Sequence, residues 1–191
     1  MANILKKRSA AVVITVLVCA VSLLAGVHLS VGRQAKKIEN AFETGVYYDG
    51  YLHPAISDQL DDRQNAALGI ITIASGYEEL SAPTDGLRSA RQQLLDAEDG
   101  TLYDKYAANE KLEAAYEKLM TAMDGVSLSD DNAAAMESYS ATMEGAQNLI
   151  STSGYNLAVS EFNRDILGSF PVSILRYPAF VDAPEFFGAE G

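Results

Sequence analysis

Residues 9–32 read SAAVVITVLVCAVSLLAGVHLSVG, a run of 24 residues without a formal charge between Arg8 and Arg33. As an α-helix this run is about 36 Å long at about 1.5 Å per residue, against a hydrocarbon core of about 30 Å. Its large apolar side chains point to all sides of such a helix: Val12, Val13, Ile14, Val16, Leu17, Val18, Val21, Leu23, Leu24, Val27, Leu29 and Val31. Because no polar stripe interrupts them, the stretch predicts a helix that spans a membrane and not one that lies on its surface.

A cleaved signal peptide is the alternative reading of this end of the chain. A basic start and the triplet Ala20-Val21-Ser22 both fit one. The apolar run, however, continues past the triplet to Val31 and is longer than the usual signal core of about 7–15 residues. We therefore predict an uncleaved anchor, so that residues 9–32 contact the lipid bilayer.

The orientation of the anchor follows from the basic residues on its two sides. Lys6, Lys7 and Arg8 precede the apolar run, and three more basic residues follow it within residues 33–37. The positive-inside rule is nearly balanced by these counts, and the N-terminal amine adds one charge to the short end. We predict that residues 1–8 lie in the cytoplasm and that the rest of the chain forms an extracytoplasmic domain of a single-pass cell-membrane protein.

The charge of the chain is unevenly distributed. Residues 1–33 carry four basic and no acidic residues, and the whole chain has a net charge of −12, so residues 34–191 carry −16. Such a domain repels phosphate backbones, which argues against nucleic acid as a partner. It is also repelled by an anionic leaflet, which favours a domain that stands away from the headgroups. The partners that remain are other membrane proteins or a second copy of this chain.

Cys19 is the only cysteine and lies inside the apolar run. An intramolecular disulfide and a cysteine-based zinc site are therefore excluded. Leu17 and Val18 precede it, where a lipid-attachment box needs small residues. We interpret Cys19 as a small apolar side chain in a lipid-facing helix.

Helical periodicity continues beyond the anchor. One apolar stripe extends the first helix to about residue 46: Val31, Ala35, Ile38, Phe42 and Val46. Gly45, Gly50 and His53-Pro54 then predict a break. The tyrosines of this break are expected to pack at the end of the bundle and not to bind a partner: Tyr47, Tyr48 and Tyr51.

Further helices are predicted from caps and apolar faces. A second helix should begin near Ser57 or Asp58, either of which can cap it. A third helix is predicted to end at Gly100 and a fourth to stop at Gly125, with a single long helix kinked at Gly100 as the alternative. The apolar faces of the second, third, fourth and last helices are predicted in turn as Leu60, Ala67, Ile71 and Ala74; Leu87, Ala90, Leu94 and Ala97; Tyr106, Leu112, Tyr116, Leu119 and Met123; and Met136, Met143, Ala146 and Ile150.

The last predicted helix runs from about Asn132 to Phe170, after a cap at Ser129 or Asp130, and bends at Gly154. Pro171 should end it, because proline lacks an amide proton and disfavours helix in the residue before it. An extended tail is expected over residues 172–191.

The fold class that follows is all-α, with an N-terminal transmembrane helix and an antiparallel bundle of long helices. Seams with a seven-residue spacing, as in coiled coils, favour this packing. The predicted organisation is a basic segment (1–8), the membrane helix (9–32), the bundle domain (33–171) and the tail (172–191).

The densest pattern in the chain is a motif near the C-terminus. Its members are Tyr155, Asn156, Val159, Phe162, Asn163, Ile166, Phe170 and Pro171. Together with Pro184-Glu185-Phe186-Phe187 and with Ile38-Glu39-Asn40-Ala41-Phe42, it resembles the LemA family of bacterial membrane proteins. The resemblance implies one N-terminal membrane helix, a helical bundle, no established enzymatic activity and action through protein partners.

The chain departs from that family at the start of the second helix, where the family carries an arginine-rich stretch. Residues 60–68 read LDDRQNAAL here, with Arg63 as their only basic residue. The chain therefore resembles a divergent member, and a role of this segment is not implied.

Asn156 and Asn163 are seven residues apart, so on one helix they share a face beside the aromatic seam. A buried asparagine must find a hydrogen-bond partner and thereby fixes helix register. We favour this structural role over the alternative, in which both asparagines face a groove and bind a ligand.

Residue groupings that carry enzymatic chemistry are missing from the sequence. The two histidines are His28, inside the anchor, and His53, before a proline, and no phosphate loop, dinucleotide motif or serine elbow is present. We expect no catalytic residue, no cofactor and no metal. The predicted function is a membrane-anchored interaction or scaffold module, with a membrane-remodelling or array-forming protein and a metal-dependent hydrolase as alternatives.

Overall fold

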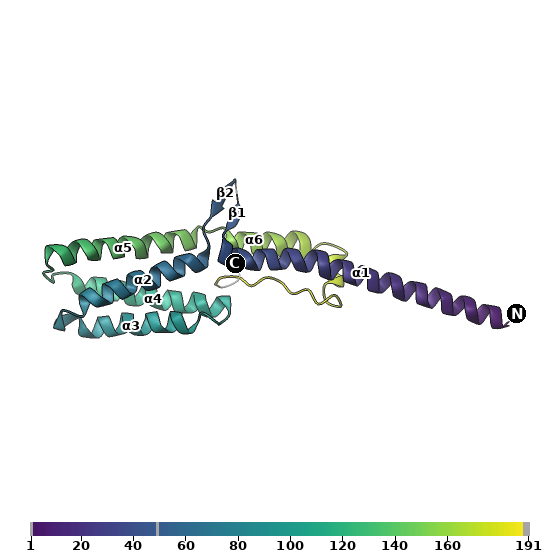
Figure 1. The fold of residues 1–191 in the computed structure, drawn as a ribbon, viewed down its shortest axis with the longest axis horizontal. Coiled ribbons are helices and arrows are strands. Elements are labelled where there is room, and N and C mark those ends of the chain that lie inside the picture. The colour runs from purple at the N-terminus through teal and green to yellow at the C-terminus, as the bar shows by residue number, and fades with distance from the viewer. Residues whose placement is uncertain (1, 49, 189–191) are drawn as a thin grey trace. The chain divides into compact units, whose positions relative to one another are not determined.

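The structure is a computed structural model that describes residues 2–48 and 50–188, and almost all of its regular structure is helical (Figure 1). Its elements are α1 (Ala2–Thr44), β1 (Val46–Tyr48), β2 (Tyr51–His53), α2 (Ile56–Ala74), the 3₁₀-helix η1 (Glu78–Leu80), α3 (Ser81–Asp96), α4 (Leu102–Met123), α5 (Asp130–Ser151), α6 (Tyr155–Phe162), the π-helix η2 (Asn163–Leu167) and α7 (Val172–Leu175). The prediction of an all-α fold with one long apolar N-terminal helix is confirmed.

The chain forms two compact units. The anchor unit comprises Met1–Glu39 and Leu157–Pro184, and the bundle unit comprises Asn40–Asn156 and Glu185–Gly191. These ranges differ from the predicted bundle domain (33–171) and tail (172–191), because part of the C-terminal chain belongs with α1.

The bundle unit is built from α2, α3, α4 and α5, and successive helices run in opposite directions (Figure 1). Helix α2 packs against α3 and α5, and α3 packs against α4. The predicted apolar faces supply much of the core, which includes Leu60, Ala67, Ile71, Leu87, Leu94, Leu112, Leu119, Met143 and Ile150. Burial of each large apolar side chain contributes about 1.5–3 kcal/mol, so the helices are held mainly by this shared core.

Two helix starts in the bundle unit, those of α4 and α5, have a side-chain cap, whereas those of α2 and α3 have none. Thr101 caps α4 in a capping box with Asp104, and Ser129 caps α5 as predicted. The predicted cap at Ser57 or Asp58 is wrong, because α2 begins at Ile56 and Ala55 holds its N-cap position without a side-chain hydrogen bond. The capping box also makes α3 and α4 separate helices, so the alternative of one kinked helix is wrong.

A short hairpin follows α1 where the sequence predicts only a break. Strands β1 and β2 pair antiparallel, with Tyr47 opposite Leu52 and Tyr48 opposite Tyr51. Tyr47 and Tyr51 are each 73% exposed. The expectation that the tyrosine cluster packs at the end of the bundle is therefore wrong for these two side chains.

The anchor unit has its own small apolar core, in which α1 is covered by the C-terminal chain. The buried members are Val31, Ala35, Phe162, Leu167, Ala179 and Val181, and Leu24, Val27, Ile38, Ile166 and Val172 pack against them. His28 on α1 also makes a hydrogen bond through Nδ1 with the carbonyl oxygen of Ala179, at 2.8 Å. The predicted extended tail is wrong here, since it contains α7 and packs on α1.

The predicted last helix from Asn132 to Phe170 is wrong as a single element. It is interrupted after Ser151 by Gly154, whose φ of +71° lies in the left-handed region that favours glycine. It then changes to the π-helix η2 and ends at Leu167, before Pro171 is reached. Pro171 instead occupies the N-cap position of α7.

Candidate functional site

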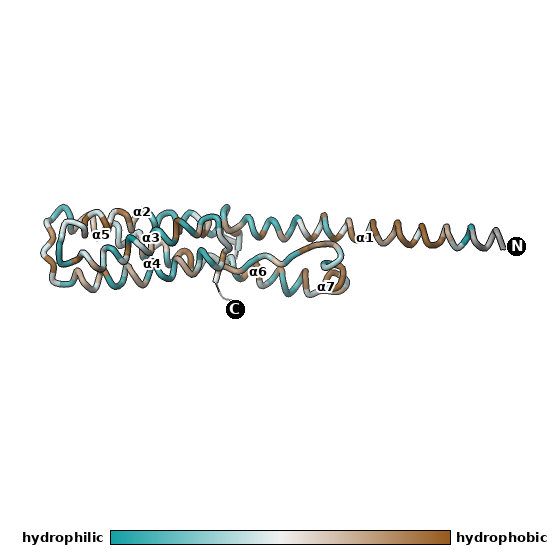
Figure 2. Tube along the Cα trace, turned by 90° about the horizontal axis from the view of Figure 1, so that it is seen from below, coloured by the Kyte–Doolittle hydropathy of each residue, from teal (hydrophilic) through white to brown (hydrophobic). Residues whose placement is uncertain are grey.

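The bare apolar surface of α1 is the most prominent functional feature of the anchor unit. Val12, Ile14, Val21 and Leu23 are each about 60% exposed, at 62%, 61%, 64% and 62%. Figure 2 shows the corresponding hydrophobic colour along this helix. Within residues 2–48 and 50–188, α1 is the one helix long and apolar enough to cross a membrane. In water such a surface is unfavourable by about 25 cal/mol per Å² of exposed apolar area.

The first two residues of the C-terminal motif hold the end of the chain in the bundle unit. The Tyr155 hydroxyl donates to the carbonyl oxygen of Glu185 at 2.9 Å. Asn156 pairs with Phe187, whose ring lies 5.6 Å from the ring of Phe42 and 5.6 Å from that of Tyr106. Through these contacts Tyr155 and Asn156 hold residues 185–187 in place. The Asn156 side chain binds the backbone of Phe187, whereas the prediction expected it to fix the register between helices.

The rest of the motif lies in the anchor unit. Val159 and Phe162 are buried, and Ile166 is half-buried against the core. Asn163 carries a buried Oδ1 for which no hydrogen-bond partner is present among the described residues. Phe170 is 82% exposed, so the predicted seam ends before it. The motif is thus divided between the two units and does not form one binding groove.

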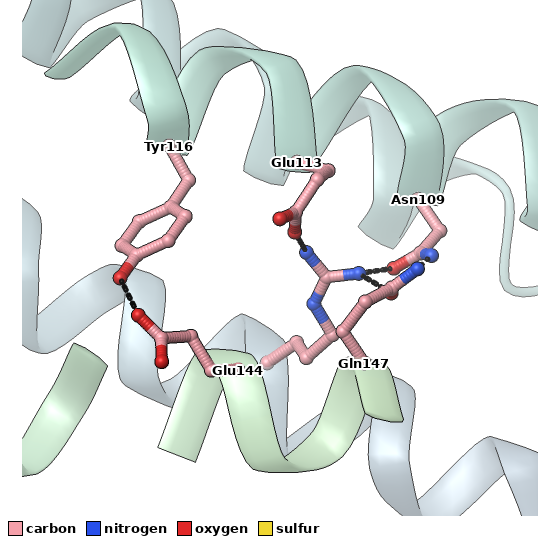
Figure 3. A network of polar contacts seen from close by, with 6 residues as sticks. Asn109, Glu113, Tyr116, Glu144 and Gln147 are labelled. Carbon is pink, nitrogen blue, oxygen red and sulfur yellow. Dashed lines mark hydrogen bonds and ion pairs between the residues drawn. The ribbon is translucent and has the colours of Figure 1, made fainter. Parts of the chain in front are cut away.

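The bundle unit contains a polar network that was not predicted from the sequence, centred on the buried Arg63 of α2. Its members Asn109, Glu113 and Gln147 are labelled in Figure 3. The Arg63 side chain is 0% exposed, and its Nη1 donates to Asn109 Oδ1 at 2.5 Å and to Gln147 Oε1. Its Nη2 forms an ion pair with Glu113. Asn109 in turn donates to Gln147 at 3.1 Å. The network therefore links α2, α4 and α5 in the interior of the bundle.

The electrostatics of this network favour a structural role. Burial lowers the pKa of Arg63 from its ordinary value, and Glu113 opposes that change. Burial likewise raises the pKa of Tyr116, which lies three residues after Glu113 on α4. The Tyr116 hydroxyl donates to Glu144 at 3.5 Å. Because the guanidinium is enclosed and already paired with a carboxylate, it has no charge left to offer an anionic ligand.

A signal for Arg63 was present in the sequence. It lies three residues after Leu60 and four before Ala67, both on the apolar face of α2. A basic residue on a face that must be buried requires acceptors from neighbouring helices. Which helices supply them depends on packing, and Asn109, Glu113 and Gln147 lie 46 to 84 residues further along the chain.

The bundle unit also has a hollow of about 360 Å³ beside α2. It is lined by Phe42, Glu43, Ser57, Leu60, Asp61, Gln64, Leu94, Glu98, Asp99 and Lys105. The pKa of Asp61 is raised, first by burial and then by neighbouring carboxylates such as Glu98. Across residues 2–48 and 50–188 no group of three or more His, Cys, Asp or Glu side chains is placed to hold a metal ion. The hollow therefore presents several acidic side chains together with Ser57 and Lys105.

The candidate site that these observations leave is the exposed surface of α1 together with the segment packed on it. Comparison of the chain with protein-family models, with curated proteins and with solved structures finds no match.

Proposed function

We propose that this protein is a single-pass membrane protein in which α1 crosses the bilayer and the bundle unit serves as a non-enzymatic interaction module. The single observation that carries the anchor is the bare apolar surface of α1, with Val12, Ile14 and Val21 each more than 60% exposed. A bilayer removes this surface from water, and the helix satisfies its own backbone hydrogen bonds there. The resemblance of the C-terminal motif to the LemA family supports the same reading.

The orientation that we propose has the N-terminus in the cytoplasm and the bundle unit outside it. Three basic residues at positions 6–8 and the N-terminal amine support this, against three basic residues at positions 33–37. A reporter that is active on one side of the membrane only, fused after Gly191, tests the orientation. Activity on the extracytoplasmic side is the expected result, and activity in the cytoplasm reverses the proposed orientation while leaving the anchor intact.

An interaction role for the bundle unit is supported by the exposed aromatic side chains of its hairpin. In the Arg63 network both terminal nitrogens, Nη1 and Nη2, are already paired with internal partners. On the surface, the hairpin presents Tyr47, Tyr51 and Leu52, which are 73%, 73% and 67% exposed. Tyrosine is enriched at protein interfaces because it combines a large apolar ring with a hydroxyl. We propose that the hairpin contacts the extramembrane part of another membrane protein.

Crosslinking in native membranes tests this role. A photoreactive residue at position 47 is expected to capture a discrete protein band, and the substitution Tyr51→Ala in the same chain should weaken it. The matched control carries the photoreactive residue at Tyr103 of α4, which is 59% exposed but lies outside the hairpin. Equal capture from both positions, or none from position 47, contradicts the proposal, and capture of a second copy would indicate an array-forming protein.

A further inference from the structure

The C-terminal part of the anchor unit exposes large apolar side chains on one short segment. Within residues 170–180, Phe170 is 82% exposed, Ile174 63%, Tyr177 68% and Phe180 83%. Single exposed apolar residues are ordinary on soluble proteins, but four in eleven residues indicate a surface that contacts a membrane or another protein. Phe180 also has a φ of +53°, a left-handed conformation that bulky residues rarely adopt.

This segment is fixed on α1 by its opposite side. Val172 packs against the core of the anchor unit, and Ala179 and Val181 are members of it. The carbonyl oxygen of Ala179 accepts a hydrogen bond from Nδ1 of His28 at 2.8 Å. The exposed residues thus alternate with residues that are held against the helix. Their position along α1 is therefore determined by His28 and by the core around Val31.

That position coincides with the end of the hydrocarbon core of a membrane crossed by α1. Twenty residues of helix span about 30 Å, the thickness of the hydrocarbon core. Counted from Ser9, the first residue after Arg8, they end at His28. The segment bonded to His28 consequently lies at the level where lipid tails give way to headgroups.

The charges around the segment match an anionic lipid surface. Residues 24–38 and 170–180 contain no acidic residue, and they carry Arg33, Lys36, Lys37 and Arg176. The anchor unit as a whole has eight basic and four acidic residues, whereas the bundle unit has six basic and 22 acidic ones. Arg33, Lys36 and Lys37 are exposed. Basic residues beside a membrane helix are attracted to anionic headgroups.

Arg176 and Tyr177, in this segment, are residue types that are common at membrane interfaces. The Arg176 guanidinium lies 4.7 Å from the centroid of the Tyr177 ring and donates to its hydroxyl at 2.9 Å. Tyrosine and arginine are anchoring residues at the headgroup level. In the same unit, a hollow of about 360 Å³ is lined by the basic residues Arg33 and Lys36, the acidic residues Glu39 and Asp182, and apolar residues that include Phe180.

We infer that residues 170–180 form an interfacial segment, which inserts Phe170, Ile174, Tyr177 and Phe180 into the headgroup region of the membrane that α1 crosses. The inference rests on the proposed function, because it needs α1 to span the bilayer. It goes beyond that function in giving the C-terminal chain a lipid-binding surface of its own. The chain thereby touches the membrane at two places that are more than 130 residues apart in sequence.

Tryptophan substitution of the full chain tests the inference, because the natural sequence contains no tryptophan and each variant has a single emitter. The variants Tyr177→Trp and Phe180→Trp are reconstituted into vesicles of phosphatidylcholine and phosphatidylglycerol. The lipids carry bromine, a fluorescence quencher, either near the headgroup or near the end of the acyl chain. Both variants are expected to lose most of their emission with shallow bromine and less with deep bromine.

Two control variants separate failure of the inference from failure of the proposed function. Leu17→Trp, in the middle of the bare run, should be quenched by deep bromine, and Tyr103→Trp, in the acidic bundle unit, by neither lipid. If Leu17→Trp is not quenched, the anchor itself is refuted. If Leu17→Trp is quenched but Tyr177→Trp and Phe180→Trp are not, the interfacial segment alone is refuted. Bromine-insensitive emission that shifts with the protein-to-lipid ratio would assign the surface to a second copy and likewise overturn the inference.

Discussion

The side-chain amide of Asn156 pairs with both backbone polar groups of Phe187. Its Nδ2 donates to the carbonyl oxygen at 2.8 Å, and its Oδ1 accepts from the amide at 2.9 Å. The Asn156 side chain thus makes the same two hydrogen bonds to Phe187 that a residue of a neighbouring antiparallel strand would make through its backbone. It holds Phe187 where its ring meets Phe42 and Tyr106, and so ties the C-terminal residues 185–187 into the bundle unit.

Replacement of Asn156 by alanine should release this C-terminal segment. Loss of two hydrogen bonds costs about 1–3 kcal/mol in total. Hydrogen exchange at the Phe187 amide should accelerate in the Asn156→Ala variant, because the amide loses its acceptor. Asn65→Ala, at an exposed position on α2, is the matched control and should leave exchange at Phe187 unchanged. Unchanged protection in Asn156→Ala would show that aromatic packing alone holds the segment.

Arg63 should be the most sensitive charged residue of the bundle unit. Arg63→Ala leaves Asn109 Oδ1 without its donor and Glu113 without its ion pair, and it opens a cavity, so we expect the free energy of unfolding to fall by about 3–5 kcal/mol. Arg88→Ala removes an ion pair with Asp85 whose side chains are 54% and 66% exposed, and it should change stability by less than about 1 kcal/mol. Urea unfolding in detergent, followed by circular dichroism, compares the two.

Arg63→Met separates the volume of the arginine from its hydrogen bonds. Methionine fills much of the same space without a donor, so its loss of stability should lie between those of Arg63→Ala and the natural chain. A methionine variant as unstable as the alanine variant would attribute the whole effect to the polar network. One as stable as the natural chain would contradict the importance of that network.

The capping box of α4 makes a pH-dependent contribution to stability. Hydrogen bonds from the Thr101 hydroxyl and amide lower the pKa of Asp104 below its ordinary value of 3.8. The stabilisation is therefore fully present above the unfolded pKa and is lost as the pH falls through the lower, folded pKa. The natural chain should be more stable than Asp104→Asn at pH 7, and the difference should shrink below about pH 4. A difference that stays constant down to acidic pH would contradict the assignment.

The N-terminus of the mature protein decides between an anchor and a signal peptide. Protein isolated from membranes should have the intact mass of the full chain, apart from processing of the initiating methionine. Cleavage after Ser22 would shorten it to a chain beginning at Leu23. Because the core of the anchor unit begins at Leu24, folding and stability do not discriminate between the two forms, and the mass does. Chains that start at Leu23 would refute the anchor.

Local rules predicted the features that depend on neighbouring residues. The apolar faces of α3, α4 and α5 are buried where the spacing places them, as at Leu94, Leu119 and Met143. Ser129 caps its helix as a hydroxyl before an acidic turn should. In these cases each residue's partners are set by helical geometry within one or two turns, so the sequence alone contains the answer.

The failures arose where distant segments decide the structure. The four-residue spacing of Phe162, Ile166 and Phe170 places them on one face only if the α-helix is continuous. The chain instead changes to the π-helix η2 after Phe162, and η2 ends at Leu167. The return of residues 179–181 onto α1 depends on contacts across 150 residues, which no local pattern records. Arg63 enters the sequence interpretation only as the one basic residue of residues 60–68, although its position between Leu60 and Ala67 already required partners inside the bundle.

The apolar core shared by α1 and the C-terminal chain has a practical consequence for dissecting this protein. Hydropathy places the end of the anchor at residue 32, and a soluble fragment would ordinarily begin just after it. Such a cut removes Leu24, Val27 and Val31, and it leaves Phe162 and Val181 without the surface on which they pack. A fragment that begins at Leu23 keeps every member of that core. The long apolar helix α1 thus also supplies one side of the core against which residues 162–181 pack.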